Sequence, residues 1–598
     1  MLRRLTHSLP TLGLVVAMMP LANAQTSTAK SHASADQNEN LKAADAAFRA
    51  GSAAFQQNDL HTAHMQFAKL IRLAPQIAAG HTAFGTVLLA EGDPHTAAAQ
   101  LELARKLDPT DINAALNLAL AYVQLRDNAK AVAMFELADQ AKQPFSPEST
   151  IAYAAALTAT SQLAVAQSKL EQALATAPDN ASLHDALGSL LAQQERYNDA
   201  GSQFQLALTL NPSLASAHYH LGSLYLAQND AVNAVAELTQ ANALTKGNLD
   251  FTLQLGRALR AAHQDEQSAT VFRHALQLDP NSIDSKYELA LTLQASDNAR
   301  EALPLFEQVA DARPKDPAVL INLGLALVQL GDAKRAISFY MQALKLTPES
   351  GTLREDLGVA YLQQSDLDHA IEQFRAGLAV EPDNPQLHYD LGLAFKLKDN
   401  IAAAIPEFEQ AAKLDPQLPD PPYTLGVVYM QLGRFPEAQA ELEKATTLRP
   451  DNSDAWALLG NVYKQNDNPQ KAVAALQRTI ELRPDQPSPH ITLASILSQQ
   501  GDTAGAAAER KKAADLSRVA VNRQRANFAL DSGRLLLKRG QLAEAVAQFQ
   551  TAVAADPNYA EAHAALADAF AQQGRNADAA LERQQAQKLT QANSAPHP

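Results

Sequence analysis

Histidine is the residue type whose spacing most suggests a chemical role. Six of the sixteen histidines recur at one phase of the regular spacing described below: His81, His184, His218, His388, His490 and His563. A zinc site needs three or four converging ligands, and we expect no carboxylate of fixed phase to join these residues. We therefore interpret the six histidines as ring side chains at the edge of a packed face, and we expect no metal site.

The motifs of common catalytic sites are missing from the sequence. It contains no G-x-x-x-x-G-K-[ST], no H-E-x-x-H, no G-x-S-x-G and no G-x-G-x-x-G after a strand. It also has no cysteine, which excludes disulfides, thiolate zinc sites, iron–sulfur clusters and a cysteine nucleophile. We expect neither a cofactor nor an enzymatic activity.

The composition is that of a folded, acidic protein. Of the 598 residues, 46% are apolar, which is too many for a disordered chain. Lysine and arginine number 49 against 64 aspartates and glutamates, for a net charge of −15. This charge argues against a general nucleic-acid binder, so we expect no nucleic-acid partner.

Residues 1–24 have the layout of a secretory signal peptide. Arg3 and Arg4 form a basic start, an apolar run follows over 9–21, and Ala-Asn-Ala at 22–24 suits a cleavage site. The run is shorter than the ~20 apolar residues that span a bilayer, so we favour export over an uncleaved anchor. We predict a periplasmic or secreted bacterial protein whose mature chain has no transmembrane segment and starts with a flexible polar leader over 25–43.

A period of 34 residues runs through the rest of the chain. When 44–77 is taken as the first segment, the eighth position is Gly or Ala in all sixteen segments, and the twentieth is Ala in all but one. The twenty-fourth position is mostly Phe or Leu. Positions 4, 7, 8 and 11 share one helical face, as do 20, 24 and 27. Each segment is therefore predicted to form two helices, which the small residues allow to approach closely.

One segment, 453–486, shows the whole pattern in phase: Trp456, Leu459, Gly460, Tyr463, Ala472 and Pro484. The sequence closely resembles the tetratricopeptide repeat, and the resemblance covers 44–593. One helical hairpin cannot bury its apolar face alone, so successive hairpins must stack. We predict an all-α fold, an α-solenoid superhelix of about sixteen 34-residue helix-turn-helix repeats.

The repeat is interrupted once. Fourteen repeats occupy 44–520, and five inserted residues follow at 521–525. Two further repeats with a polar cap occupy 526–593, and a tail remains at 594–598. Since no Gly or Pro lies between residues 505 and 533, the second helix of the fourteenth repeat is expected to run on past its normal end.

The interruption is basic. The stretch 509–539, which we call the basic seam, holds nine basic and three acidic residues. Such a patch could dock an acidic partner, anionic lipid headgroups or an anionic polysaccharide. It could instead be a long solvated helix, and we favour this second interpretation. The residues at its centre are Arg510, Lys511, Lys512, Arg518, Arg523 and Arg525.

The resemblance also implies a binding surface. In tetratricopeptide superhelices the first helix of each repeat lines the concave face, with positions 2, 5, 9, 12 and 13 pointing into it. Over 283–452 these positions are largely apolar and rich in tyrosine, and exposed patches of this kind usually mark interaction sites. Packing between neighbouring first helices is the alternative, and the sequence leaves both open. The candidate groove residues are Tyr287, Leu291, Ile321, Leu325, Val359, Leu362, Tyr389, Leu393, Lys396, Tyr423, Val427 and Met430.

The ways in which members of this family are known to bind ligands restrict the kinds of partner that this chain could bind. The clamp for a C-terminal carboxylate needs Lys at position 5 and Asn at 9 of one repeat, and no repeat has this pair. An asparagine ladder needs Asn repeatedly at position 6, where only Asn117 and Asn322 occur. We predict a non-catalytic scaffold or adapter in the cell envelope that binds a protein or peptide segment on the concave face, for assembly or secretion. The alternatives are a binder of anionic polysaccharide or membrane through 509–539, and an accessory subunit of a glycosyltransferase or polysaccharide-export system.

Overall fold

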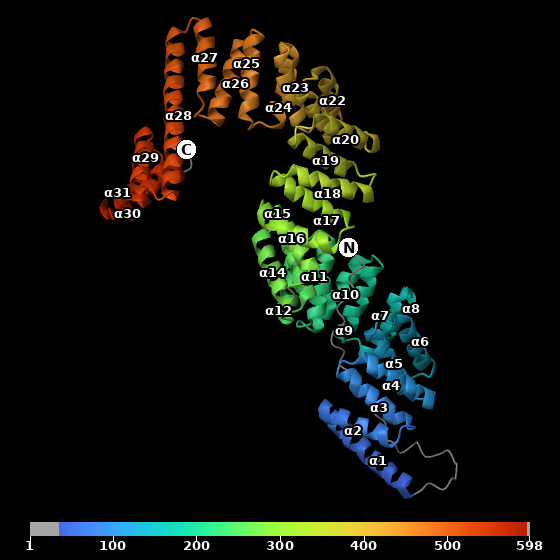
Figure 1. Ribbon diagram of the computed structural model, residues 1–598. Coiled ribbons are helices and arrows are strands. Elements are labelled where there is room, and N and C mark those ends of the chain that lie inside the picture. Colours follow the sequence, from blue (N-terminus) through green and yellow to red (C-terminus); the bar gives the residue numbers. More distant parts are fainter. Residues whose placement is uncertain (1–34, 595–598) are drawn as a thin grey trace. The chain divides into compact units, whose positions relative to one another are not determined.

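The computed structural model describes residues 35–594, and within this range it is built of helices without strands. This confirms the predicted all-α fold. The chain forms two compact bodies, one ending at Leu330 and one beginning at Gly331. We describe each body by itself (Figure 1). The predicted signal peptide, most of the predicted leader and all but the first residue of the tail lie outside the described residues.

The first body contains α1 (Ala35–Gln56), α2 (Leu60–Leu73), α3 (Ala78–Ala90), α4 (Pro94–Leu107), α5 (Ile112–Gln124), α6 (Asn128–Gln140), α7 (Pro147–Ala159), α8 (Leu163–Thr176), α9 (Ala181–Gln193), α10 (Tyr197–Leu210), α11 (Ala215–Ala227), α12 (Ala231–Leu244), α13 (Leu249–Ala261), α14 (Asp265–Leu278), α15 (Ile283–Ala295), α16 (Ala299–Ala312) and α17 (Pro317–Gln329). The second body contains α18 (Ala333–Leu346), α19 (Gly351–Gln363), α20 (Leu367–Val380), α21 (Pro385–Leu397), α22 (Ile401–Leu414), α23 (Asp420–Gln431), α24 (Phe435–Leu448), α25 (Ser453–Gln465), α26 (Pro469–Leu482), α27 (Pro487–Gln499), α28 (Thr503–Lys538), α29 (Leu542–Ala555), α30 (Ala560–Gln572) and α31 (Asn576–Ser594).

The two helices of a repeat pack closely because the predicted small residues lie between them. In the repeat 181–214, a Cβ added at Gly188 would come within 2.6 Å of the Phe204 ring, and Gly392 stands in the same relation to Phe408. Both rings are almost fully buried. The eighth-position glycine makes room for the aromatic ring at position 24 of the same repeat, so the small residues let the two helices approach closely, as predicted.

A sharp turn separates the helices of each repeat. Gly92 adopts a φ of 81° in this turn, and the same place in other repeats is held by Asn58 at 58° and Glu195 at 63°. The second helix then often begins with an aspartate or asparagine cap; the Asp93 side chain, for example, accepts a hydrogen bond from the Thr96 amide at 3.0 Å. Such caps satisfy amides at the helix start, so each repeat fixes its own turn locally.

The start of helix α1 and the length of helix α28 both bear on predictions made from the sequence. Helix α1 begins at Ala35, so the end of the predicted leader over 25–43 is helical, which corrects that part of the prediction. Its residues Ala, Asp, Gln, Glu and Leu extend the first helix because nothing in this stretch breaks a helix. The expected long helix is confirmed: α28 runs without interruption from Thr503 to Lys538 and includes 521–525.

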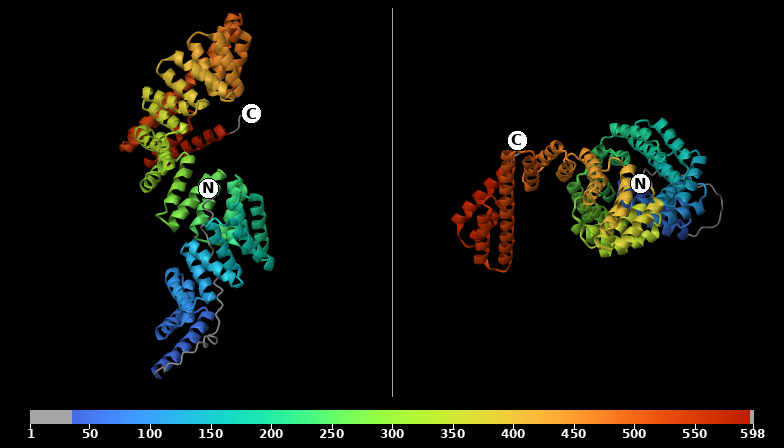
Figure 2. Two further views of the ribbon diagram at one scale, coloured as in Figure 1. Left: turned by 90° about the vertical axis from the view of Figure 1, so that its right-hand side faces the viewer. Right: turned by 90° about the horizontal axis from the view of Figure 1, so that it is seen from above.

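Helix α28 joins two stacks within the second body. Its first half packs against α27, and its second half packs against α29 and α30. Figures 1 and 2 show α28 as a long helix with α29 to α31 along its C-terminal half. The second helix of the fourteenth repeat and the first helix of the fifteenth are thus one continuous helix.

Candidate functional site

The recurring histidines are structural, as the sequence analysis interpreted them. Nε2 of His81 lies 2.9 Å from the carbonyl oxygen of Pro75, and Nδ1 lies 2.7 Å from Oε1 of Gln100. Trp456 occupies the same position in its repeat, and its indole N–H donates to the equivalent carbonyl, that of Pro450, at 3.0 Å. Histidine therefore takes over the hydrogen bond of tryptophan. The expectation that no carboxylate of fixed phase accompanies these histidines is wrong. Four of the six contact a glutamate 19 residues later, at 2.5 to 2.6 Å: His218, His388, His490 and His563. The described residues contain no group of histidines and carboxylates arranged to hold a metal ion.

The first helices of successive repeats form one face within each body. In the first body α3 contacts α5, α9 contacts α11 and α13 contacts α15, and in the second body α19 contacts α21 and α23 contacts α25. We call the surface made by positions 5, 6, 9 and 12 of these helices the first-helix face. This surface is the candidate binding site, because it is where the repeats present side chains that a partner can reach.

A polar ladder crosses the first-helix face of the first body. Position 9 of one repeat contacts position 6 of the next, 31 residues later. The pairs are Thr86 with Asn117 at 2.8 Å, Ser189 with His220 at 3.2 Å, Ser223 with Gln254 at 3.4 Å and Arg257 with Glu288 at 2.6 Å. These pairs were not predicted from the sequence, and the 31-residue spacing is the signal that would have found them.

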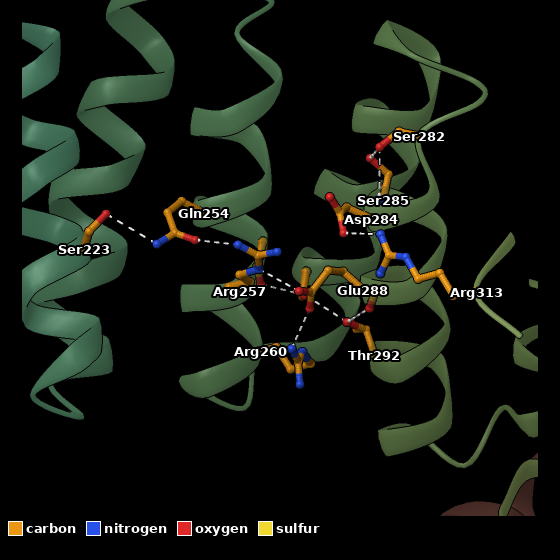
Figure 3. A network of polar contacts seen from close by, with 12 residues as sticks. Ser223, Gln254, Arg257, Arg260, Ser282, Asp284, Ser285, Glu288, Thr292 and Arg313 are labelled. Carbon is orange, nitrogen blue, oxygen red and sulfur yellow. Dashed lines mark hydrogen bonds and ion pairs between the residues drawn. The ribbon is translucent and has the colours of Figure 1, made fainter. Parts of the chain in front are cut away.

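The last pair of this ladder, Arg257 with Glu288, belongs to a charged cluster (Figure 3). The Glu288 carboxylate is buried and accepts hydrogen bonds from Arg257 Nε and Arg260 Nη2, each at 2.6 Å. Arg257 also donates to Gln254 Oε1 at 3.0 Å, and Arg260 Nε is buried without a partner. Two guanidinium groups share one carboxylate, so the cluster keeps a net positive charge and unused N–H donors.

Both Asn117 and Asn322 are engaged within the chain. Asn117 Nδ2 donates to Thr86 Oγ1, and Asn322 Nδ2 donates to the Tyr287 hydroxyl at 3.0 Å. Their amides are therefore committed to neighbouring repeats, which agrees with the expectation that no asparagine ladder is present.

The predicted groove residues are divided between the two bodies. In the first body Tyr287, Leu291 and Ile321 are half-buried, whereas Leu325 is exposed. Asn322 and Tyr287 join α17 to α15. The half-buried side chains both pack between first helices and keep one edge accessible, and their role in binding a partner stays a prediction.

The second body holds the remaining groove residues on α19, α21 and α23. All are half-buried and most lie against the hydrophobic core: Val359, Leu362, Tyr389, Leu393, Lys396, Tyr423, Val427 and Met430. The Tyr389 hydroxyl lies 3.2 Å from Thr424 Oγ1 on the next first helix. The sequence left open whether these residues are core or exposed groove. Each side chain is buried on one side and accessible on the other, so both interpretations hold in part.

Three carboxyl groups lie on the same face of α19 and α21. Asp390 is buried, and this burial raises its pKa to about 6. Burial likewise raises the pKa of Asp356 to about 6. Burial, followed by the nearby charges of Asp390, Asp356 and Glu381, raises the pKa of Glu355 to about 7. The sequence analysis did not single out these residues, because position 6 is polar in many repeats and burial is not visible in the sequence.

The basic seam is partly neutralised by the chain itself. Lys512 pairs with Glu509 at 2.9 Å and Arg518 with Asp515 at 2.6 Å, and Arg523 pairs with Asp556. Arg510, Lys511 and Arg525 have no ion-pair partner among the residues that the structure describes. The seam is therefore less charged than its composition indicates, in line with the interpretation as a solvated helix.

Comparison with known families identifies the repeat. Models described as tetratricopeptide or TPR repeat match residues 82–147, 154–215, 287–351, 355–419, 397–462, 453–486 and 533–574. Together they match more than half of the chain, and the match over 453–486 has the bounds of a repeat predicted from the sequence. The chain belongs to the tetratricopeptide repeat family.

Solved structures that match this chain include three at 16% to 25% identity. The Cut9 and Hcn1 hetero-tetramer of the APC/C is 16% identical, with 88% of this chain and 96% of that chain covered and a TM-score of 0.34. YrrB, a TPR protein with an unusual peptide-binding site, is 24% identical, with coverages of 31% and 95% and a TM-score of 0.27. MamA from Desulfovibrio magneticus RS-1 is 25% identical, with coverages of 28% and 96% and a TM-score of 0.28. No curated protein matches the chain.

Family and fold together define the class of protein. Tetratricopeptide repeats are protein-interaction modules, and this chain is a protein–protein interaction scaffold built from them. Within 35–594 no helix is both long enough and apolar enough to cross a bilayer.

Proposed function

We propose that the protein is an exported, non-catalytic adapter of the bacterial cell envelope that binds a protein or peptide segment on the first-helix face of the second body, and that it serves envelope assembly or secretion. One observation carries the proposal. Tyr389 and Leu393 keep accessible edges on α21, the helix that carries Asp390, and Tyr423 keeps one on α23. Burial raises the pKa of Asp390 to about 6 and that of Glu355, on the preceding first helix α19, to about 7.

This combination indicates the chemistry of the partner. Half-exposed tyrosine and aliphatic side chains anchor a partner through apolar contact. The nearby carboxyls are poorly solvated, so a lysine or arginine of the partner would favour their charged form. The segment that fits is therefore apolar with at least one basic residue. Its binding should weaken as the pH falls through 7 to 6, because protonation removes the charges it would neutralise.

Photocross-linking tests the site. A benzophenone amino acid would replace Leu393 or Val427 in the full chain, and native envelope extract would be irradiated at low and high salt. We expect both positions to capture the same polypeptide at 0.5 M NaCl, because apolar contacts persist when charges are screened. The control is Leu346, an exposed leucine at the end of the second helix α18.

The pattern of capture distinguishes the groove from the basic seam. Capture at positions 393 and 427 but not at 346 supports the groove, and a Tyr389→Ala/Tyr423→Ala variant should lose it. Equal capture at all three positions, or none, would overturn the site. Capture that vanishes in high salt and in an Arg523→Ala/Arg525→Ala variant would instead favour the alternative, a binder of anionic polysaccharide or membrane through the basic seam.

Export has its own test. The proposal rests on the sequence pattern of residues 1–24, which lies outside the described residues. Amino-terminal sequencing of the protein from its native host should begin at Gln25 in the periplasmic or secreted fraction. A chain that keeps residues 1–24 and stays in the cytoplasm would refute the envelope role while leaving the scaffold class intact.

A further inference from the structure

Helix α28 carries apolar side chains that are buried at the same positions of other repeats. In those repeats the third and tenth positions of the first helix pack on the second helix of the preceding repeat. Phe251, at a third position, is only 4% exposed, and Leu224, at a tenth position, is buried. In the fifteenth repeat the same positions hold Phe528 and Leu535, which are 76% and 49% exposed. The face that should meet a preceding repeat is therefore open.

The structure shows which residues such a face normally meets. A Cβ added at Gly80, a third position, would lie 3.2 Å from the Leu70 side chain and 3.7 Å from the Ile71 side chain, at positions 27 and 28 of the preceding repeat. A Cβ added at Gly201, at position 21, would lie 3.5 Å from Leu224 at the tenth position of the following repeat. Position 3 thus packs near positions 27 and 28, and position 10 packs near position 21.

The matching face of the fourteenth repeat is also open. Its positions 21 and 28 are Ala507 and Ala514, and both are exposed, whereas position 27, Ala513, is only 4% exposed. Beside Ala514 lies a hollow of about 630 Å³ that Ile491 and Arg510 help to line. Arg510 stands at position 24, where other repeats place Phe or Leu in the core, and Ile491 is 58% exposed.

The two open faces cannot meet within one chain while α28 is intact. Ala514 and Phe528 are separated by about 21 Å along the helix, at 1.5 Å per residue. No Gly or Pro lies between residues 505 and 533 to break it. A second copy, running antiparallel, can satisfy both faces at once.

We propose that two copies of the chain pair through α28 about a two-fold axis at Val521. In this arrangement Phe528 lies on Ala514 of the second copy, and Leu535 lies on Ala507 of the second copy. Both pairs are centred on residue 521. One two-fold axis therefore reproduces both contacts that neighbouring repeats make elsewhere in the chain. Each copy then supplies the repeat that the other lacks, a reciprocal exchange of the kind that yields closed dimers.

The shape and spacing of the side chains fit this pairing. Ala507, Ala514, Val521, Phe528 and Leu535 follow one another at steps of seven residues, and all five are exposed. A seven-residue apolar repeat keeps two helices in contact when they wrap with a left-handed twist. Each small alanine faces a large side chain of the other copy, and Val521 faces itself. The hollow beside Ala514 gives room for the Phe528 ring.

A cysteine on the axis tests the proposal, because the chain has no cysteine of its own. In the full-length protein a Val521→Cys substitution should give a covalent dimer under mild oxidation, since residues on a two-fold axis come within disulfide reach. Val519→Cys is the matched control. Val519 is 60% exposed against 47% for Val521, but it points away from the proposed contact. We expect at least tenfold more cross-linked dimer for Val521→Cys.

The mass in solution provides a second readout. Light scattering should give twice the chain mass for the wild type, and Phe528→Asp should give monomer without loss of helix. Val232→Asp is the matched control, because Val232 is also 76% exposed but lies on α12. Nine basic against three acidic residues in 509–539 of each copy repel one another. The dimer should therefore tighten several-fold from 0.05 to 0.5 M NaCl.

The proposal fails if the wild type is monomeric at every salt concentration. It also fails if the two cysteine variants cross-link equally, or if Phe528→Asp leaves the dimer intact. A dimer that loosens with salt would show that opposite charges, rather than the α28 faces, hold the copies together.

Discussion

Replacing Asp390 by asparagine should stabilise the second body at neutral pH. Asp390 is 7% exposed on α21, and burial raises its pKa from the ordinary 3.8 to about 6. The folded state therefore holds this proton more tightly than the unfolded state. Its contribution to stability is complete below pH 4 and is lost as the pH rises through 6. At pH 7.5 the ionised carboxyl costs about 3 kcal/mol of unfolding free energy, at ~1.4 kcal/mol for each pKa unit.

The asparagine side chain of the Asp390→Asn variant would copy the shape of the neutral carboxyl without the charge. Hydrogen exchange followed by mass spectrometry, corrected for the intrinsic rate at each pH, can measure the change within α21. The amides of Asp390→Asn should exchange about a hundredfold more slowly than those of the wild type at pH 7.5. At pH 5 the difference should fall to about tenfold, because the wild-type folded state is then protonated.

A slowing of equal size at both pH values would refute the reasoning, because the effect would then come from packing rather than titration. So would the absence of any slowing at pH 7.5. Asp383→Asn serves as the control, since Asp383 is exposed on the loop before α21 and its replacement should leave exchange unchanged.

Three further predictions concern packing, backbone and charge. Gly392→Ala would place a Cβ 2.6 Å from the Phe408 ring, and this overpacking should cost ~1–3 kcal/mol, seen as faster exchange in α21 and α22. Glu195→Gly should stabilise its repeat by ~1 kcal/mol in the same measurement, because Glu195 holds a φ of 63° that glycine adopts without strain. A double-mutant cycle of Arg257→Met and Glu288→Gln should give a coupling energy of ~1–3 kcal/mol in urea unfolding of the first body, because the pair is bonded at 2.6 Å and partly buried.

Each of these has a result that would count against it. Unchanged exchange in Gly392→Ala would mean that the helices separate without cost. Faster exchange in Glu195→Gly would show that the glutamate side chain contributes more than its backbone strain removes. A coupling energy near zero would mean that solvent screens the Arg257–Glu288 pair as it screens surface pairs.

The repeat period located most of the fold from the sequence. The segments beginning at 78, 112, 181 and 215 coincide with the starts of α3, α5, α9 and α11. This succeeded because the small residues at positions 8 and 20 are required by close helix packing, so every repeat displays them. Helix α1 began earlier than predicted because residues 35–43 mix good and weak helix formers without Gly or Pro, and such a polar stretch has no signature of its own.

The candidate site was predicted less completely. Position 9 of each first helix was recognised, but the partner at position 6 of the next repeat was not, although Arg257 and Glu288 stand 31 residues apart. The sequence also left open whether Tyr389 is core or surface. Its hydroxyl contacts Thr424 on the next first helix while its side chain stays half-buried. Such a residue belongs partly to the core and partly to the surface, and the spacing of the helices decides how much of its side chain is buried.

The unbroken helix α28 also governs how the protein unfolds. In a stack of repeats, stability passes from neighbour to neighbour through their shared interfaces. At α28 the interface between the fourteenth and fifteenth repeats is replaced by a continuous helix. Helices α29 to α31 therefore pack against the second half of α28 and not against an earlier repeat. In a single copy, the last two repeats therefore form a separate cooperative segment that melts at its own temperature while the stack ending at α27 stays folded.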